Sequence, residues 1–369
     1  FFIHKYGSFL LLPLLFIHAR GIALLLFSVM FLEQAPLQAA MTNLKSDASF
    51  YHSEDWTNST KCKSCHGDIF KQWSNSNHKH MAGSNPYYMV LETLAGEDVS
   101  GEFRTWCMGC HNPSALTNGK TKSAHEMDGN FVRADTFEGD AKLFEKDFEQ
   151  KSNFRLEEGV SCVACHAIKK ADAKGNASFS LALKGREKYA FEDSSVGTLS
   201  FFGEKFINAN PQAHKQSYSS KLYKQSSYCA SCHNESHPIN GTKIVSTYDE
   251  WKNSPFGDKR DKKRYKTCID CHMTNLNKSG FTPLKGRSTD GGAIKKDVKV
   301  HHFAGSNHFL ASLKSKEAAE QSLFLLKQAA KLSSWTKDGK LFVRVANSGA
   351  GHHLPTGAAD FRELWLMVK

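Results

Sequence analysis

The sequence predicts a mainly α-helical protein with extensive loops and with the start of a small β domain at its C-terminus. Three observations support this fold class. Short cysteine motifs that favour helical turns recur along the chain, long polar intervals such as 169–200 show neither a helical nor a strand period, and strand-like apolar segments occur near the end. With 369 residues, the chain has room for one large domain or two ordinary ones.

All ten cysteines fall into five copies of one motif, CxxCH, and none is left over. The paired cysteines are Cys62 and Cys65, Cys107 and Cys110, Cys162 and Cys165, Cys229 and Cys232, and Cys268 and Cys271. The histidines that follow them are His66, His111, His166, His233 and His272.

This motif is typical of covalent haem attachment. Two thiols at this spacing lie on one side of a helical turn and add across the porphyrin vinyl groups, while the next histidine becomes the proximal iron ligand. Zinc sites and thioredoxin-like pairs use CxxC but do not account for the histidine, and a disulfide framework predicts varied spacings. The sequence therefore predicts five haem c groups, each with its iron.

The intervals between motifs are only a few tens of residues long. Five macrocycles cannot be buried separately by so little polypeptide, so we expect a multihaem cytochrome c scaffold organised around haems that pack against one another. Residues 41–335 are assigned to this pentahaem domain. A regular packing helix is predicted between Asn307 and Ser333, where apolar residues recur at helical spacing.

Strands are predicted at 341–346 and 364–368, around a turn with Gly351, Pro355 and Gly357. We assign 336–369 to the beginning of a truncated β-rich domain. The chain begins without methionine and ends in an apolar run, so we expect a fragment at both ends.

Residues 1–40 are predicted to be a signal peptide, because Arg20 precedes the apolar run 22–32 and small residues follow at 39–40. A membrane anchor is the alternative, but His18 and Arg20 would lie near its middle, where charge is costly. We expect export to the periplasm or the exterior of a bacterial cell, because covalent haem attachment takes place on that side of the membrane.

The net charge of +11 does not indicate nucleic-acid binding. Each haem carries two propionates, so five haems bring up to about ten negative charges that nearly cancel the excess. No nucleic-acid-reading motif is present either. The basic run 259–266, directly before the fifth motif, is a solvated loop, a partner of propionates or a docking site for an acidic redox protein.

Four segments resemble the cytochrome c-554 family and its relatives around hydroxylamine oxidoreductase. They are Trp73–His78, Gly159–His166, Tyr248–Trp251 with Ser254, and Thr267–Met273. The first of them, Trp73–His78, directly follows the first CxxCH motif and fits the family's WxxSxH signature. The resemblance runs from about Lys61 to Met273 and continues more weakly to the end. It implies a multihaem c-type cytochrome.

Eleven histidines remain for the second axial positions after the five proximal ones and two in the targeting segment are set aside. The resemblance implies distal ligands at His78, His214, His301 and His352, and we expect His125 as the fifth. The neighbouring histidines His80, His302 and His353 remain alternative ligands. His52 and His237 are equally compatible with surface positions.

Two functions follow from these observations. We favour a non-catalytic electron carrier, because histidines exceed the number needed to close every iron and no catalytic motif is visible. Its partners would be other cytochromes, a quinol-oxidising membrane module or an extracellular acceptor, and it could assemble as a homo-oligomer or filament. The alternative is an oxidoreductase with one open haem acting on a small nitrogen or sulfur species. The CxxCK motif of pentahaem nitrite reductases does not occur.

Overall fold

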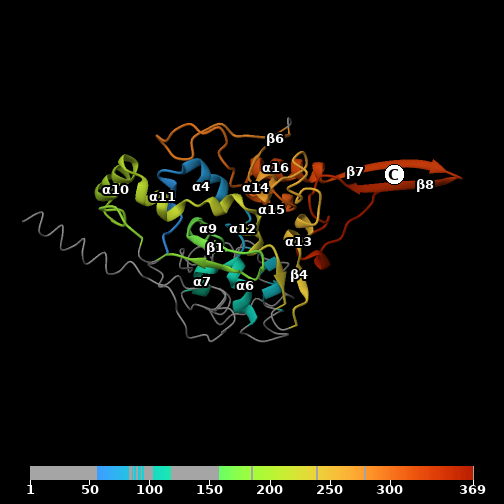
Figure 1. Cartoon of the computed structure of the whole chain (residues 1–369), viewed down its shortest axis with the longest axis horizontal. Helices are drawn as coiled ribbons and strands as arrows, with labels where there is room; N and C mark the ends of the chain where they lie inside the picture. Colours follow the sequence, from blue (N-terminus) through green and yellow to red (C-terminus); the bar gives the residue numbers. More distant parts are fainter. Residues whose placement is uncertain are drawn as a thin grey trace, which may run out of the picture.

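The computed structural model describes residues 56–82, 85, 87–88, 90–92, 94, 103–117, 158–183, 186–237, 240–277 and 280–368. In these residues short helices, loops and two-stranded antiparallel sheets alternate along the chain (Figure 1). The expected helices and loops are confirmed. The predicted signal peptide, 1–40, lies outside the described residues.

A short helix lies at each of the five CxxCH motifs. Capping fixes where these helices begin: the Ser161 hydroxyl accepts a hydrogen bond from the Ala164 amide at 3.0 Å, and Thr267 forms a capping box with Asp270. Residues three apart lie on one face of a helical turn, so both thiols of a motif face the same side. The helices are α3 (Thr60–Lys63), α6 (Phe103–His111), α9 (Cys162–His166), α12 (Ser226–Ala230) and α14 (Cys268–His272).

The other helices connect or cover the motifs. They are α4 (Gly67–Ser74), α7 (Pro113–Thr117), α10 (Gly197–Ala209), α11 (Gln212–Tyr218), η3 (Lys221–Lys224), α13 (Thr247–Lys252), α15 (His308–Lys314), α16 (Lys316–Ala329) and η4 (Ala359–Phe361). In Figure 1, α10 lies on the left, α4 lies above α9 near the middle, α12 and α14 lie beside them, and α6 lies below. Within the described part of the chain, no helix is long and apolar enough to cross a membrane.

The strands form four separate hairpins in the described residues. They are β1 (Ile168–Ala171) with β2 (Phe179–Leu181), β3 (Glu235–Ser236) with β4 (Lys243–Val245), β5 (Asn275–Asn277) with β6 (Gly280–Thr282), and β7 (Ala330–Lys337) with β8 (Lys340–Asn347). The first of these, and the start of α10, lie in the interval 169–200 that the sequence predicted as loop, so that expectation was wrong in part.

The prediction of a single helix between Asn307 and Ser333 was also wrong. Ser315 has an extended backbone, with φ −153° and ψ 123°, and its hydroxyl caps α16 by accepting from the Ala318 amide at 3.3 Å. The chain therefore forms α15 and α16 on either side of it, and α16 ends at Ala329 where β7 begins. The side that packs is made mainly of small residues around Ala318, whereas the larger Leu323 is 37% exposed.

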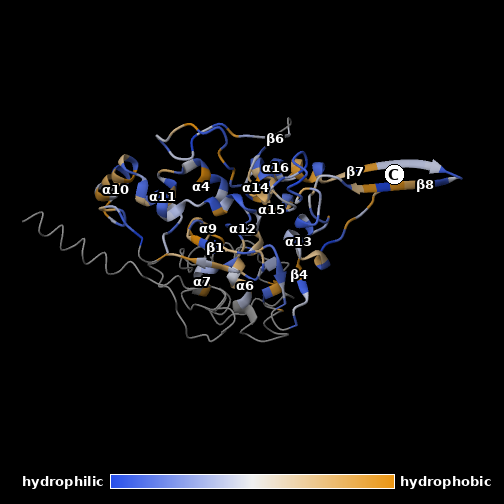
Figure 2. Ribbon diagram, in the orientation of Figure 1, coloured by the Kyte–Doolittle hydropathy of each residue, from blue (hydrophilic) through white to orange (hydrophobic). Residues whose placement is uncertain are grey.

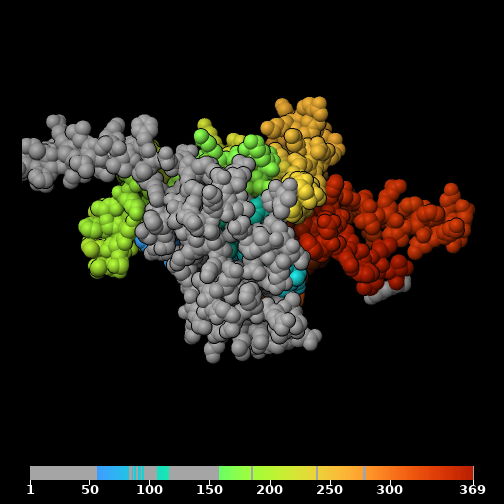
Figure 3. Space-filling view, turned by 90° about the horizontal axis from the view of Figure 1, so that it is seen from below, coloured from blue at the N-terminus to red at the C-terminus, as the bar shows by residue number. Residues whose placement is uncertain are grey.

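The strand predicted at 341–346 is confirmed as part of β8, but its partner is β7 rather than 364–368. Asp338 and Gly339 join the two strands, and both have positive φ, 51° and 68°. A two-residue Asp-Gly turn of this kind closes a tight hairpin. The described residues 364–367 form no strand. Within the described residues, the hairpin and residues 364–367 lie at one end, and α10 lies at the other (Figure 3).

The largest apolar core cluster among the described residues lies around the second and third motifs. It includes Trp56, Trp106, Val163, Phe179 and Leu181, each at most 6% exposed. Cysteines of the second and fourth motifs pack against its edge. This core therefore surrounds the CxxCH segments themselves.

A buried carboxylate joins the segments of the first and third motifs. Glu158 is 1% exposed, and its two oxygens accept from the Ser59 amide at 2.9 Å and the Ser59 hydroxyl at 2.8 Å. The Ser59 hydroxyl in turn accepts from the Cys162 amide at 3.2 Å. Glu158 thus holds α3 against the start of α9.

We expect Glu158→Ala to lower the free energy of unfolding by roughly 2–4 kcal/mol, because two buried Ser59 donors lose their acceptors. Guanidinium unfolding followed by far-UV circular dichroism measures the change. Glu187→Ala, at an exposed position, is the control and should stay within about 0.5 kcal/mol of the parent. Equal stabilities of the two variants would contradict a structural role for the Glu158 carboxylate.

Candidate haem sites

Cysteines of different motifs lie beside one another. The thiols lie close enough to interact in three pairs: Cys62 with Cys162, Cys110 with Cys232, and Cys229 with Cys268. The third and fourth motifs also meet, because the Tyr228 hydroxyl donates to the Cys165 carbonyl at 3.0 Å. The motifs are therefore connected in the order first, third, fourth, fifth, and the second motif joins this row at the fourth.

Backbone carbonyls orient four of the five motif histidines. A carbonyl only accepts, so Nδ1 of each of these rings carries the hydrogen, and Nε2 keeps its lone pair for a metal. The contacts are His66 Nδ1 to Ser288 O at 2.5 Å, His111 Nδ1 to Met81 O at 2.9 Å, His166 Nδ1 to Tyr218 O at 2.9 Å and His272 Nδ1 to Ala304 O at 2.7 Å.

A second histidine ring lies opposite four of these motif histidines. The ring-centre distances are 6.1 Å for His66 and His214, 6.5 Å for His166 and His301, 6.3 Å for His233 and His78, and 6.2 Å for His272 and His352. Three pairs are within 21° of parallel, and the His78 pair is inclined by 49°. All four partners are histidines that the sequence predicted as distal ligands.

These spacings fit a metal ion held between two imidazoles. A metal bonds an imidazole nitrogen at about 2.0–2.1 Å, and the nitrogen lies about 1 Å from the ring centre, so two rings on opposite sides of one ion are roughly 6 Å apart. Each gap also lies beside a pair of thiols that could tether a porphyrin. The residues present therefore fit haem iron.

A family comparison agrees with this geometry. The model of the family "Cytochrome c554 and c-prime" matches residues 61–131 and 228–291, which contain the first, second, fourth and fifth motifs. The chain is a multihaem c-type cytochrome that resembles this family. The resemblance inferred from the sequence is confirmed. This cytochrome carries its third motif between the two matched segments.

Among solved structures, the cytochrome is similar to a penta-heme cytochrome c552 from Thermochromatium tepidum. The TM-score is 0.47 at 18% identity, covering 82% of this chain and 68% of that one. No curated protein matches the chain.

The second motif differs from the others in its ring contacts. His111 stacks on Tyr88 with a ring-centre distance of 4.2 Å and an angle of 13°. This distance is too short for a metal ion between the two rings, so the Tyr88 ring stacks on the face of the His111 imidazole. His125, the ligand expected to complete the set, lies outside the described residues, as does His52.

The alternative distal histidines have other contacts. His80 Nε2 lies 3.1 Å from the Ser74 carbonyl. His302 Nε2 lies 3.4 Å from Glu317 and His353 Nδ1 3.3 Å from Glu250, both within ion-pair distance. His237 donates its backbone amide to Thr242. Sequence reasoning could not choose between adjacent histidines, because a shift of one residue reverses which side of the chain a ring faces.

Burial keeps the imidazoles in the neutral form that binds metals. It lowers the pKa of His78 to about 3 and the pKa values of His233 and His301 to about 4, and neighbouring imidazoles add to the effect. Burial also lowers the pKa of His111, His166 and His272. In contrast, burial raises the pKa of the Glu235 carboxyl to about 7.

These shifts make stability depend on pH. The folded pKa of each buried histidine lies below its unfolded value of 6.5. Below pH 6.5 the unfolded chain therefore binds protons that the folded chain excludes, and the free energy of unfolding decreases as the pH is lowered. Glu235, with a raised folded pKa, opposes this between about pH 7 and 4.5. From pH 7 to 5.5 the contribution of the several buried histidines exceeds that of the one carboxyl, so we expect a net loss of stability.

Guanidinium unfolding of the purified cytochrome at pH 7.0 and about 5.5 measures this loss. Glu235→Gln removes the opposing proton, so its stability should fall more steeply over the same range. A stability that is unchanged or higher at the lower pH, in both proteins, would contradict neutral buried histidines.

Proposed function

We propose that this cytochrome carries electrons through five covalently attached haem c groups. The observation that supports this most strongly is the set of four imidazole pairs, 6.1–6.5 Å apart, each beside its own pair of thiols. A pair of histidines closes both axial positions of an iron, which then exchanges electrons without binding a substrate. The cytochrome is accordingly a carrier rather than an enzyme.

The residues that would hold the haems are those of the CxxCH motifs together with the paired histidines. The proposed iron ligands are His66 with His214, His166 with His301, His233 with His78, and His272 with His352. His111 is the proximal ligand at the second motif, for which His125 stays our proposed partner. When bound, haem supplies a reversible one-electron couple.

The protein's own residues would hold each redox site still. Carbonyl contacts at Nδ1 fix the ring orientation at four motifs, and burial keeps the imidazoles unprotonated. An iron ligand that does not reorient between the two oxidation states keeps the reorganisation energy of electron transfer low. The contacts between the first, third, fourth and fifth motifs support electron transfer from haem to haem in that order.

We also propose that the cytochrome works outside the bacterial cytoplasm, in the periplasm or at the cell exterior. Residues 1–40 would direct export, 41–335 would form the haem domain and 336–369 would begin a further β-rich domain. Partners would be other cytochromes, a quinol-oxidising membrane module or an extracellular acceptor. Homo-oligomers or filaments would extend the same path.

The ligand pairs can be tested one at a time. We expect each of His214→Ala, His301→Ala, His352→Ala and His78→Ala to convert one low-spin haem to high spin, because the iron loses one axial nitrogen. Electron paramagnetic resonance of the ferric protein measures the spin state, and a pyridine haemochrome assay measures the number of haems, expected to be five.

Matched controls stand beside three of these histidines. His302→Ala, His353→Ala and His80→Ala should leave every haem low-spin, since these rings contact Glu317, Glu250 and the Ser74 carbonyl instead. A high-spin signal from a control and none from its neighbour would reverse the assignment of that pair. Absence of bound haem in the parent would end the proposal altogether.

One observation favours a second candidate function. His111 contacts the Tyr88 ring, and within the described residues its ring is not paired with another imidazole across a 6 Å gap. If the second haem is open, the cytochrome would be an oxidoreductase acting on a small nitrogen or sulfur species at that iron. Electrons would then pass through the other four haems.

The spectrum of the unmodified protein separates the two functions. As a carrier with five closed haems, the ferric cytochrome should give low-spin signals alone, and its ferrous form should not bind carbon monoxide. One high-spin haem in five, with carbon monoxide bound by the reduced protein, would favour the oxidoreductase. Replacing Cys107 and Cys110 by Ala removes the thiols that would tether the second haem, and should abolish that signal if the open haem is the second.

A further inference from the structure

A strongly basic loop precedes the fifth motif. We define the basic loop as residues 252–266, which contain seven lysines and arginines and two aspartates. The loop connects α13 to α14, so its last residue lies two positions before Cys268. An excess of positive charge is thus fixed beside one particular haem site.

The basic loop is held in a defined shape. The Trp251 indole donates to the Lys266 carbonyl at 2.8 Å, and the Lys266 amide donates to the Phe256 carbonyl at 3.0 Å. Gly257 passes so close to Trp251 that an added Cβ would lie 2.3 Å from its carbonyl oxygen. The side chains of the loop are therefore presented on a fixed surface rather than on a freely moving chain.

The positive charges of the loop differ in their partners. Arg260 pairs with Asp258 at 2.9 Å, and Arg264 pairs with Asp261. The exposed lysines Lys259, Lys262 and Lys263 have no carboxylate within ion-pair distance in the described part of the chain. Their charges face solvent and are available to another molecule.

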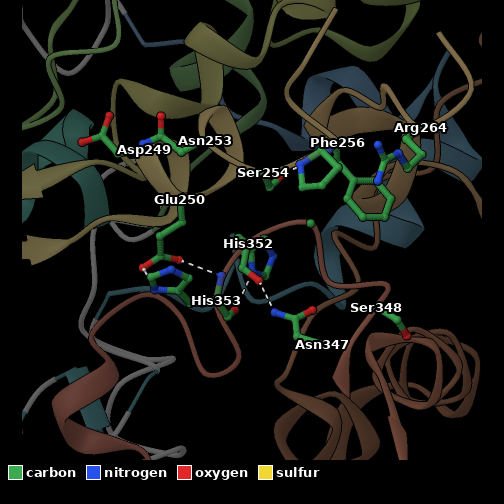
Figure 4. A pocket seen from close by; sticks show the side chains of 12 residues that line it. Asp249, Glu250, Asn253, Ser254, Phe256, Arg264, Asn347, Ser348, His352 and His353 are labelled. Atoms are coloured by element: carbon green, nitrogen blue, oxygen red, sulfur yellow. Dashed lines mark hydrogen bonds and ion pairs between the residues drawn. The ribbon is translucent and has the colours of Figure 1, made fainter. Parts of the chain in front are cut away.

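The loop lies at the edge of the fifth haem site. Arg264 and Phe256 line the same cavity of about 660 Å³ as His352, the partner of His272 (Figure 4). The Phe256 ring lies 3.5 Å from the position that a Cβ on Gly351 would take, next to His352. A protein that rests on the loop would come close to this site.

We propose that the basic loop is the docking surface for an acidic electron-transfer protein, which exchanges electrons with the haem of the fifth motif. The proposal rests on the proposed electron transfer and adds where the partner binds. Opposite charges raise the rate of encounter and orient the partner. Lys259, Lys262 and Lys263 are exposed, as a docking surface requires.

The test compares two triple variants with equal changes in net charge. The loop variant is Lys259→Glu with Lys262→Glu and Lys263→Glu. The control is Lys215→Glu with Lys221→Glu and Lys224→Glu, at exposed positions of α11 and η3 near the first and third sites. The probe is a reduced plant-type ferredoxin, a small acidic iron–sulfur protein, and stopped-flow absorbance at the haem bands gives the second-order rate constant.

At an ionic strength of about 10 mM we expect the loop variant to react at least about tenfold more slowly than the parent, and the control to lose less than about threefold. At about 0.5 M salt the three rates should converge, because screening removes the attraction. Equal losses in both variants would show that net charge alone matters, and no loss in the loop variant would exclude docking there. Either result overturns the proposal.

Haem content and ferric spin state are measured for all three proteins. If the parent holds no haem, the proposed electron transfer fails, whereas normal haem with equal rates removes only the docking surface. Should the loop variant lose its fifth haem, the milder Lys259→Gln, Lys262→Gln and Lys263→Gln set replaces it, and a retained fast rate there counts against the proposal.

Discussion

The gaps of 6.1–6.5 Å between paired imidazoles constrain the rest of this chain. Each gap requires two segments that are distant in sequence to bring their imidazoles about 6 Å apart, as His78 and His233 do. Short helices at the motifs and irregular segments between them meet the requirement, which accounts for a fold with little continuous sheet or helix.

What could be predicted from the sequence is what chemistry fixes locally. The spacing of Cys162, Cys165 and His166 specifies a helical turn, and the structure has that turn because Ser161 caps it. The histidines of the four pairs were also predicted, through resemblance. Their partners were not, because pairing depends on how loops return to the motifs. His214 could have met several motif histidines, and only the three-dimensional arrangement sets it opposite His66.

The two errors near the C-terminus have local causes. Ser315 is compatible with a helix by composition, but its hydroxyl competes for a backbone amide and begins a new helix instead. The Asp338-Gly339 turn, with positive φ at both residues, closes β8 onto the preceding β7 and not onto the more distant segment 364–368. The hairpin leaves Leu332, Leu341 and Val345 more than half exposed, and Figure 2 shows hydrophobic positions along it.

The surfaces near the two ends of the connected row of motifs carry different exposed side chains. Near the first motif, α10 approaches Cys65 through Asn208, and it exposes Phe201 and Phe202 by about half. Near the fifth motif, the surface is the positive basic loop. Encounters driven by charge are long-ranged and weakened by salt, while apolar contacts act only at short range. A charged protein partner of the proposed kind would therefore be guided to the fifth site.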